Sequence, residues 1–164
     1  MNKTIVVYGS STGTCEAIAE KIASKLGAEV INVQDLTADI VAENQNLILG
    51  TSTWGAGELQ DDWYDGLNTL KAADLSGKVI ALFGCGDSAS YSDTFVGGIG
   101  ELYDGIKNSG ARFIGEVETD GYTFDDSAAV VDGKFIGLPL DDINEDDKTD
   151  DRIDAWVAAI SPNL

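Results

Sequence analysis

Short apolar runs alternate along this sequence with stretches of helical periodicity, as in Ile18, Ile22 and Leu26. The runs are rich in β-branched residues, which is typical of strands covered on both faces. Because strands that alternate with helices form parallel sheets, the pattern predicts an α/β doubly wound fold. The predicted strands cover residues 3–8, 28–33, 46–51, 78–84 and 112–117, with a further strand-like segment at 134–140.

Helical patterns are predicted at residues 13–26, 35–43, 61–70, 95–106 and 149–160, the second being the weakest. Asp61 and Asp62 are expected in the first turn of the third helix, and Thr149 is expected to cap the last one. Four glycines in the fourth helix lower its propensity and predict close packing against a neighbouring element. Since no internal repeat, linker or domain boundary is evident, residues 1–164 are expected to form one domain.

The segment after the first strand is suited to bind an anion. Its hydroxyl side chains and glycine, which follow Gly9, are Ser10, Ser11, Thr12, Gly13 and Thr14. A helix is predicted to begin there, and the first N–H groups of a helix lack partners while the helix dipole makes that end partly positive. Such a loop can bind phosphate. Taken alone, the segment is equally well explained as an ordinary, well-capped turn.

Two further segments are expected at the same edge of the sheet. In doubly wound folds, ligands bind beyond the carboxyl ends of the strands, where the strand order reverses. The segments after the first, third and fourth strands, residues 9–15, 51–60 and 84–94, should therefore meet at one site.

Two common nucleotide motifs are absent from these segments. Gly84 and Gly86 begin the G-x-G-x-x-G pattern of dinucleotide sites, but Ala89 stands where the third glycine belongs. The first segment has no lysine, which excludes a Walker loop. A receiver domain would require an acidic pair where Ser10 and Ser11 stand. A phosphate site of hydroxyls and amides, without lysine, suits a single terminal phosphate.

Two aromatic side chains, Trp54 and Tyr91, follow different strands at this edge. Two flat side chains on separate loops can sandwich a planar heterocycle. Each one alone is better explained by exposure or by packing against its own loop. Together with the hydroxyl-rich segment, they predict a site for flavin mononucleotide (FMN).

At this point the sequence resembles the flavodoxin family over nearly its whole length. The motifs that carry the resemblance are residues 10–14, 50–63, 82–91, 119–122 and 131–138. The last two resemble the insertion that splits the fifth strand in the long-chain subgroup. The resemblance implies a five-stranded parallel sheet in the order 2-1-3-4-5, with helices on both faces.

The resemblance also implies roles for particular residues. Trp54 and Tyr91 would flank the isoalloxazine ring, with Tyr91 nearly parallel to it, and backbone groups around Asp87 and Thr94 would hydrogen-bond its pyrimidine edge. Gly55, followed by Ala56, would present its peptide near N5. The full predicted set of cofactor-binding residues is Ser10, Ser11, Thr12, Gly13, Thr14, Cys15, Thr51, Ser52, Thr53, Trp54, Gly55, Ala56, Gly57, Cys85, Gly86, Asp87, Tyr91 and Thr94.

Cys15 departs from the family pattern, because a threonine that donates to the phosphate usually stands there. A thiol is a weak donor, so a small buried core residue is the favoured interpretation.

The formal net charge of −19 argues against nucleic acid and anionic membranes as partners, and favours basic surfaces of redox proteins. The chain has no histidine, which removes the commonest metal ligand and general base, so no catalytic or metal-binding residue is predicted. Two cysteines are too few for a disulfide framework. Without a membrane-spanning run or a secretory pattern, a cytoplasmic monomer is expected.

These features predict a low-potential one-electron carrier that shuttles non-covalently bound FMN between semiquinone and hydroquinone. A carboxylate about 12 Å from the anionic reduced ring costs about 0.3 kcal/mol, or about 15 mV, so that several would shift the potential by about 50–100 mV. By resemblance, the partners are reductases and low-potential acceptors. One alternative is an FMN-dependent NAD(P)H or quinone oxidoreductase. The other is a cofactor-free acidic module that binds basic proteins.

Overall fold

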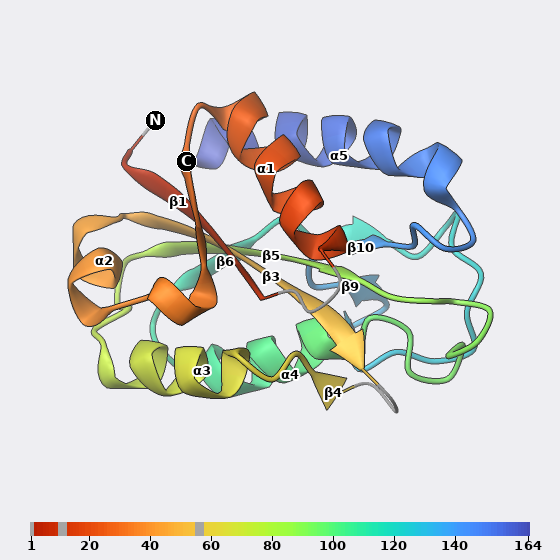
Figure 1. Ribbon diagram of the computed structural model, residues 1–164, viewed down its shortest axis with the longest axis horizontal. Helices are drawn as coiled ribbons and strands as arrows, with labels where there is room; N and C mark the ends of the chain where they lie inside the picture. The colour runs from red at the N-terminus through yellow and green to blue at the C-terminus, as the bar shows by residue number, and fades with distance from the viewer. Residues whose placement is uncertain (1, 10–12, 55–57) are drawn as a thin grey trace.

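The computed structural model describes residues 2–9, 13–54 and 58–164, and of Trp54 and Glu58 only the backbone. A parallel sheet crosses the centre of the molecule (Figure 1). Strand β1 (Thr4–Gly9) lies between β2 (Glu29–Asn32) and β3 (Asn46–Trp54), and β5 (Val79–Cys85) pairs with the other edge of β3. Every residue of β1 is buried, as expected for a strand covered on both faces.

The fifth position of the sheet is shared by two strands. β6 (Arg112–Ile114) pairs in parallel with the first half of β5, and β10 (Leu138–Leu140) pairs in parallel with the second half. Counted by position, the order 2-1-3-4-5 with a split fifth strand is therefore confirmed.

The insertion between β6 and β10 has its own small antiparallel sheet. This sheet consists of β7 (Val117–Glu118), β9 (Lys134–Phe135) and β8 (Val130–Val131), in that order. Tyr122 ties the insertion down, since its hydroxyl donates to the Pro139 carbonyl at 2.8 Å and the Arg152 guanidinium lies 4.0 Å from its ring centroid.

Helices cover both faces of the sheet (Figure 1). On one face lie α1 (Thr14–Leu26) and α5 (Asp146–Ile160), which contact each other; on the other lie α3 (Trp63–Ala72), α4 (Gly97–Ile106) and the short α2 (Ala38–Glu43). Single 3₁₀ turns follow β2 and α5, at Val33–Asp35 and Ser161–Asn163. A separate apolar core fills the space on each side of the sheet. Among the described residues, no helix is long and apolar enough to cross a membrane.

Several predicted boundaries were wrong. Residues 112–117 do not form one strand, because Gly115 takes a φ of +88° and its carbonyl accepts a hydrogen bond from Trp156 Nε1 at 2.9 Å. The segment 134–140 is likewise divided between β9 and β10. β3 extends to Trp54, and a short antiparallel strand β4 (Glu58–Leu59) pairs with its end, so that Trp54 ends a strand and does not lie in a loop.

Two helix starts also differ from the prediction. Asp61 and Asp62 precede α3, which begins at Trp63. Thr149 does not cap α5, which begins three residues earlier; the Thr149 side chain is buried, and its hydroxyl donates to Asp142.

The close packing predicted for the glycine-rich helix α4 is confirmed. A Cβ on Gly100 would lie 2.5 Å from the carbonyl oxygen of Ala128 in the insertion. One on Gly98 would lie 3.0 Å from Thr51 Cγ2. The backbone of α4 therefore lies directly against β3 on one side and the insertion on the other.

Candidate functional site

A cavity of about 220 Å³ lies at the carboxyl ends of β3 and β5, beside the start of α1. The residues that line it come from these ends, from the segment between β5 and α4, and from the turn after β10. They are Thr14, Ser52, Thr53, Cys85, Gly86, Asp87, Tyr91, Thr94, Phe95, Val96, Asp142 and Ile143.

Eight of the predicted cofactor-binding residues line this cavity, namely Thr14, Ser52, Thr53, Cys85, Gly86, Asp87, Tyr91 and Thr94. Gly13, Cys15 and Thr51 are described but do not belong to the lining. Six others, Ser10, Ser11, Thr12, Gly55, Ala56 and Gly57, lie outside the described residues. The Trp54 side chain is also not described, so its pairing with Tyr91 remains a prediction.

Gly13 and Thr14 begin α1 at the edge of this cavity. Gly13 precedes the helix with a φ of +88°, a conformation that glycine adopts without penalty, and its carbonyl accepts from Ala17 N at 3.1 Å. The end of β1 is tied to the same helix, because the Tyr8 hydroxyl donates to Glu16 Oε2 at 2.6 Å. That hydrogen bond is the main reason why the pKa of Tyr8 rises to about 12. Strand and helix are thus held on both sides of the predicted phosphate loop.

The hydroxyl of Ser52 is a polar group of the lining that lacks a partner among the described residues. Ser52 Oγ is buried, yet it has no hydrogen-bond partner in the part of the chain that the structure describes. Its neighbours are occupied: Thr51 Oγ1 donates to the Ser52 carbonyl, and Thr53 Oγ1 accepts from Gly98 N at 3.1 Å. Since buried hydroxyls are almost always paired, Ser52 is suited to bind a polar ligand.

Asp87 organises the segment that carries Tyr91. Its Oδ1 accepts from Ser90 N at 3.0 Å, from Ala89 N at 3.2 Å and from Asn144 Nδ2 at 2.8 Å. These bonds, the one from Ser90 N first, hold the pKa of the Asp87 carboxyl below its ordinary value. Tyr91 N in turn donates to the Asp87 carbonyl at 2.9 Å. The Tyr91 side chain lines the cavity and is half exposed, so a ligand can reach its ring.

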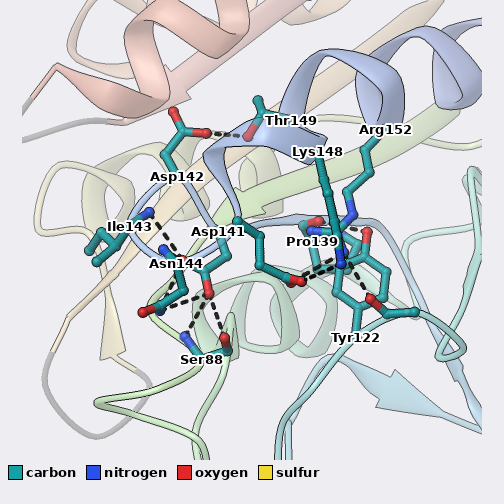
Figure 2. Close-up of polar contacts among 12 residues, drawn as sticks. Ser88, Tyr122, Pro139, Asp141, Asp142, Ile143, Asn144, Lys148, Thr149 and Arg152 are labelled. Atoms are coloured by element: carbon teal, nitrogen blue, oxygen red, sulfur yellow. Dashed lines mark hydrogen bonds and ion pairs between the residues drawn. The ribbon is translucent and has the colours of Figure 1, made fainter.

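A buried carboxylate anchors this segment to the end of β10. Figure 2 shows Ser88, Asn144 and the backbone nitrogen of Ile143 around the Asp141 carboxylate. The Asp141 side chain accepts from Ser88 N at 3.0 Å, Ile143 N at 3.1 Å and Asn144 N at 2.9 Å, and also from the Ser88 hydroxyl. Burial alone would raise the pKa of this carboxyl, but the hydrogen bonds from Ser88 and Asn144 outweigh it and hold the pKa below its ordinary range. Asp141 therefore stays ionised at neutral pH.

Four lining residues were missed by the sequence prediction: Phe95, Val96, Asp142 and Ile143. Asp142 and Ile143 belong to an acidic stretch that is typical of a solvated surface. The sequence held one signal, because Ile143 is an isolated apolar residue in that stretch. In the structure its side chain is 71% exposed. Val96 has a φ of +46°, which is strained for a β-branched residue and could not be foreseen from its type.

The two cysteines lie together beside the cavity. Cys15 is in the first turn of α1 and Cys85 ends β5; both are free and buried. The hydrogen bond between their thiols and then burial raise the pKa of the Cys85 thiol well above its ordinary value. Cys15 also packs with Ile18 and Ile22 in the core, in agreement with its interpretation as a core residue.

The lining is acidic. Its described residues include the carboxylates Asp87 and Asp142 but no lysine or arginine. Among the described residues there is also no group of His, Cys, Asp and Glu side chains that could hold a metal ion. The cavity offers one face of an aromatic ring, an unpaired hydroxyl and a helix start.

Comparison with known proteins assigns this architecture. A sequence model of the flavodoxin family matches residues 6–156. This chain belongs to the flavodoxin family. Flavodoxin 1 of Azotobacter vinelandii is 46% identical over 98% of this chain and 96% of its own length, and the flavodoxin of Helicobacter pylori is 44% identical over 98% and 97%.

A solved flavodoxin has the same fold. The crystal structure of Fusobacterium nucleatum flavodoxin bound to flavin mononucleotide superposes with a TM-score of 0.94 at 33% identity and covers 100% of this chain and 99% of the other. The insertion that separates β6 from β10 places the chain in the long-chain subgroup of flavodoxins, as its sequence motifs predicted.

Proposed function

We propose that this chain is a low-potential one-electron carrier that binds FMN non-covalently at the 220 Å³ cavity. The observation that carries the proposal is the buried, unpaired Ser52 hydroxyl, which lines a cavity together with the half-exposed ring of Tyr91. Family membership and the FMN-bound F. nucleatum flavodoxin support the same cofactor.

The proposed contacts follow the predicted motifs. Residues 10–14 would hold the phosphate with hydroxyls and with the N–H groups at the start of α1. Trp54 and Tyr91 would cover the two faces of the ring, and backbone groups around Asp87 and Thr94 would hydrogen-bond its pyrimidine edge. Gly55, followed by Ala56, would present its peptide near N5. Bound FMN supplies the redox chemistry, since it accepts and releases electrons one at a time.

The negative charges of the protein determine whether the second one-electron reduction potential of bound FMN is raised or lowered. Asp87 and Asp142 line the cavity, the described lining contains no lysine or arginine, and the chain has a net charge of −19. The hydrogen bonds that keep Asp87 ionised maintain this negative potential at neutral pH. An additional negative charge on the cofactor is therefore disfavoured, which lowers the second one-electron potential.

The same charge suits basic surfaces of redox proteins as partners, and it disfavours nucleic acid and anionic membranes. We propose that the chain works as a cytoplasmic monomer. No observation favours the oxidoreductase alternative, because the described lining offers no basic group to hold the phosphate of a pyridine nucleotide.

FMN titration followed by stepwise reduction tests the proposal. We expect tight binding that quenches flavin fluorescence, a half-reduced form that accumulates, and a second potential below that of free FMN. Tyr91→Leu should weaken binding by about fivefold, since one stacked ring contributes about 1 kcal/mol. Tyr64→Leu is the matched control, because Tyr64 is 49% exposed and Tyr91 50%, and Tyr64 does not line the cavity.

Two results would contradict the proposal. One is a protein that does not bind FMN. The other is bound FMN that takes up both electrons in a single step at the potential of the free cofactor.

A further inference from the structure

A second cavity, of about 570 Å³, lies where the insertion meets the last helix, and we refer to it as the α5 groove. The insertion contributes lining residues between Glu116 and Tyr122, and α5 contributes the exposed residues Ala155 and Ala159, one turn apart. The groove is larger than the candidate cofactor cavity, and the described linings of the two share no residue. Cavities of this size commonly hold ligands, so the groove is a binding site to be explained separately.

Two aromatic side chains, Tyr122 and Trp156, give the α5 groove an apolar lining together with Leu138. The polar atoms of both aromatic side chains are already paired. Trp156 Nε1 donates to the Gly115 carbonyl at 2.9 Å, and the Tyr122 hydroxyl donates to the Pro139 carbonyl at 2.8 Å. The rings therefore offer apolar surface to a ligand, and an apolar side chain suits this part of the groove.

The two cations that line the α5 groove, Lys148 and Arg152, are both paired with Glu145. Lys148 Nζ lies 2.8 Å from Glu145 Oε2, and Arg152 Nη2 lies 3.2 Å from Glu145 Oε1. Figure 2 shows both side chains extending from α5 toward Tyr122. Arg152 Nη1 is buried and has no acceptor within the described part of the chain. A main-chain carbonyl of a bound peptide would supply such an acceptor.

The carboxylates of the α5 groove are less well balanced than its cations. Glu118 pairs with Lys134 at 3.3 Å. Glu116, Asp120 and Asp151 are exposed and make no ion pair with any residue that the structure describes. Three unpaired carboxylates beside an apolar lining are complementary to a ligand that combines positive charge with an apolar group.

We propose that the α5 groove binds a basic segment of a redox partner protein, with an apolar side chain against Tyr122 and Trp156 and lysine or arginine side chains beside the unpaired carboxylates. The choice of a redox partner rests on the proposed function, whereas the charge and the apolar lining do not. A second copy of this chain is disfavoured as the occupant, because two copies of net charge −19 repel each other. A partner held here leaves the candidate cofactor cavity open, because the two described linings are separate.

Peptide titration of the full chain, followed by ¹⁵N NMR, tests the proposal. The probe is the peptide acetyl-Lys-Leu-Lys-Phe-Lys-amide, and its control has serine in place of leucine and phenylalanine at the same charge. We expect the probe to shift the amide signals of Gly121, Ala155 and Ala159, with the same dissociation constant in the presence and absence of saturating FMN. The control peptide should bind at least about tenfold more weakly, since it lacks the apolar anchors.

Two lysine substitutions in α5 form a matched pair. Ala155 and Ala158 are both exposed, and each stands four positions after an aspartate, but of the two only Ala155 lines the groove. Ala155→Lys places a positive charge and a long side chain in the groove, so it should weaken binding of the probe by more than about tenfold. Ala158→Lys makes the same change of charge outside the lining and should weaken binding by less than about twofold. FMN affinity should be unchanged in both variants.

Four results would overturn the proposal: no binding of the probe up to about 1 mM, equal binding of the serine control, displacement of the probe by FMN, or equal effects of the two lysine substitutions. Signal shifts confined to Tyr91 and Thr94 would place the probe in the cofactor cavity and overturn it as well. A protein that binds FMN but not the probe refutes this inference alone. A protein that binds the probe in the groove but does not bind FMN refutes the proposed function and leaves the groove established as a site for basic segments.

Discussion

Replacing Asp141 with alanine should destabilise the protein and loosen the segment that carries Tyr91. The Ser88 amide, which is buried, would lose its acceptor, at a cost of about 1–3 kcal/mol. The Ile143 and Asn144 amides belong to exposed residues and can bind water instead, so each loss costs about 0.5–1 kcal/mol. We expect Asp141→Ala to lower the free energy of unfolding by about 3 kcal/mol, out of roughly 5–15 kcal/mol for a domain.

Urea denaturation of the cofactor-free protein measures the first effect, and FMN fluorescence quenching measures the second. Because Asp141 holds Ser88 beside Asp87, the FMN dissociation constant should rise by more than tenfold. Asp141→Asn keeps the shape of the side chain but presents N–H groups to donors, so its effect on stability should be intermediate. Asp147→Ala is the control, since Asp147 is exposed in the same acidic stretch and such changes stay within about 0.5 kcal/mol. If Asp141→Ala were as stable as Asp147→Ala, the network would not anchor this segment.

Three further predictions follow from single groups. Ser52→Ala should raise the free energy of unfolding of the cofactor-free protein by about 1 kcal/mol, because a buried unpaired hydroxyl is removed, and urea denaturation measures this. The same variant should bind FMN more weakly in a titration. Unchanged FMN binding would contradict the role of Ser52. The pKa of Asp141 is lowered in the folded state, so the ionised carboxyl contributes its full share to the free energy of unfolding above the ordinary pKa of about 4. This share is lost as pH falls through the folded-state pKa. Acid denaturation should show the loss of stability, and Asp141→Asn should make stability less dependent on pH in this range. Gly100→Ala should lower the free energy of unfolding by about 1–3 kcal/mol in thermal denaturation, because the new Cβ meets a backbone carbonyl at 2.5 Å. Gly105→Ala should cost less, because its Cβ meets side-chain atoms, Leu67 Cδ2 at 3.0 Å and Lys71 Cε at 3.5 Å.

The strands of the sheet could be predicted because buried strands consist mainly of apolar residues. The strands β1, β3 and β5 are apolar runs, and each is buried along most of its length. The boundaries that were wrong depend on contacts between residues distant in the chain. Gly115 ends β6 beside Trp156, which stands 41 positions later. Thr149 is a good capping residue by type, but its hydroxyl is paired with Asp142 and the helix starts earlier.

The part of the candidate site that lies at the ends of strands could be predicted from the sequence. The ends of β3 and β5 and the start of α1 supply the predicted lining residues, because parallel strands end at one edge of the sheet. The same rule applies to the fifth strand, but its end was not included. Residues 141–151 have the composition of a solvated acidic surface, so the burial of Asp141 could not be predicted from composition.

The insertion therefore bears on the candidate site even though none of its described residues lines the cavity. By dividing the fifth strand it places β10, and not β6, beside the carboxyl end of β5. In the turn after β10, Asp141 accepts a hydrogen bond from Ser88 N and Asn144 donates one to Asp87. The segment that carries Tyr91 is therefore held by residues that follow the insertion in the chain. Tyr122, held between Pro139 and Arg152, fixes the insertion against β10 and α5 in turn. The insertion also holds this segment directly, because the N–H groups of Asp125 and Asp126 donate to the Ser92 carbonyl, next to Tyr91, at 2.8 and 2.9 Å. Changes in the insertion should thus reach the candidate site both through the position of β10 and through Ser92.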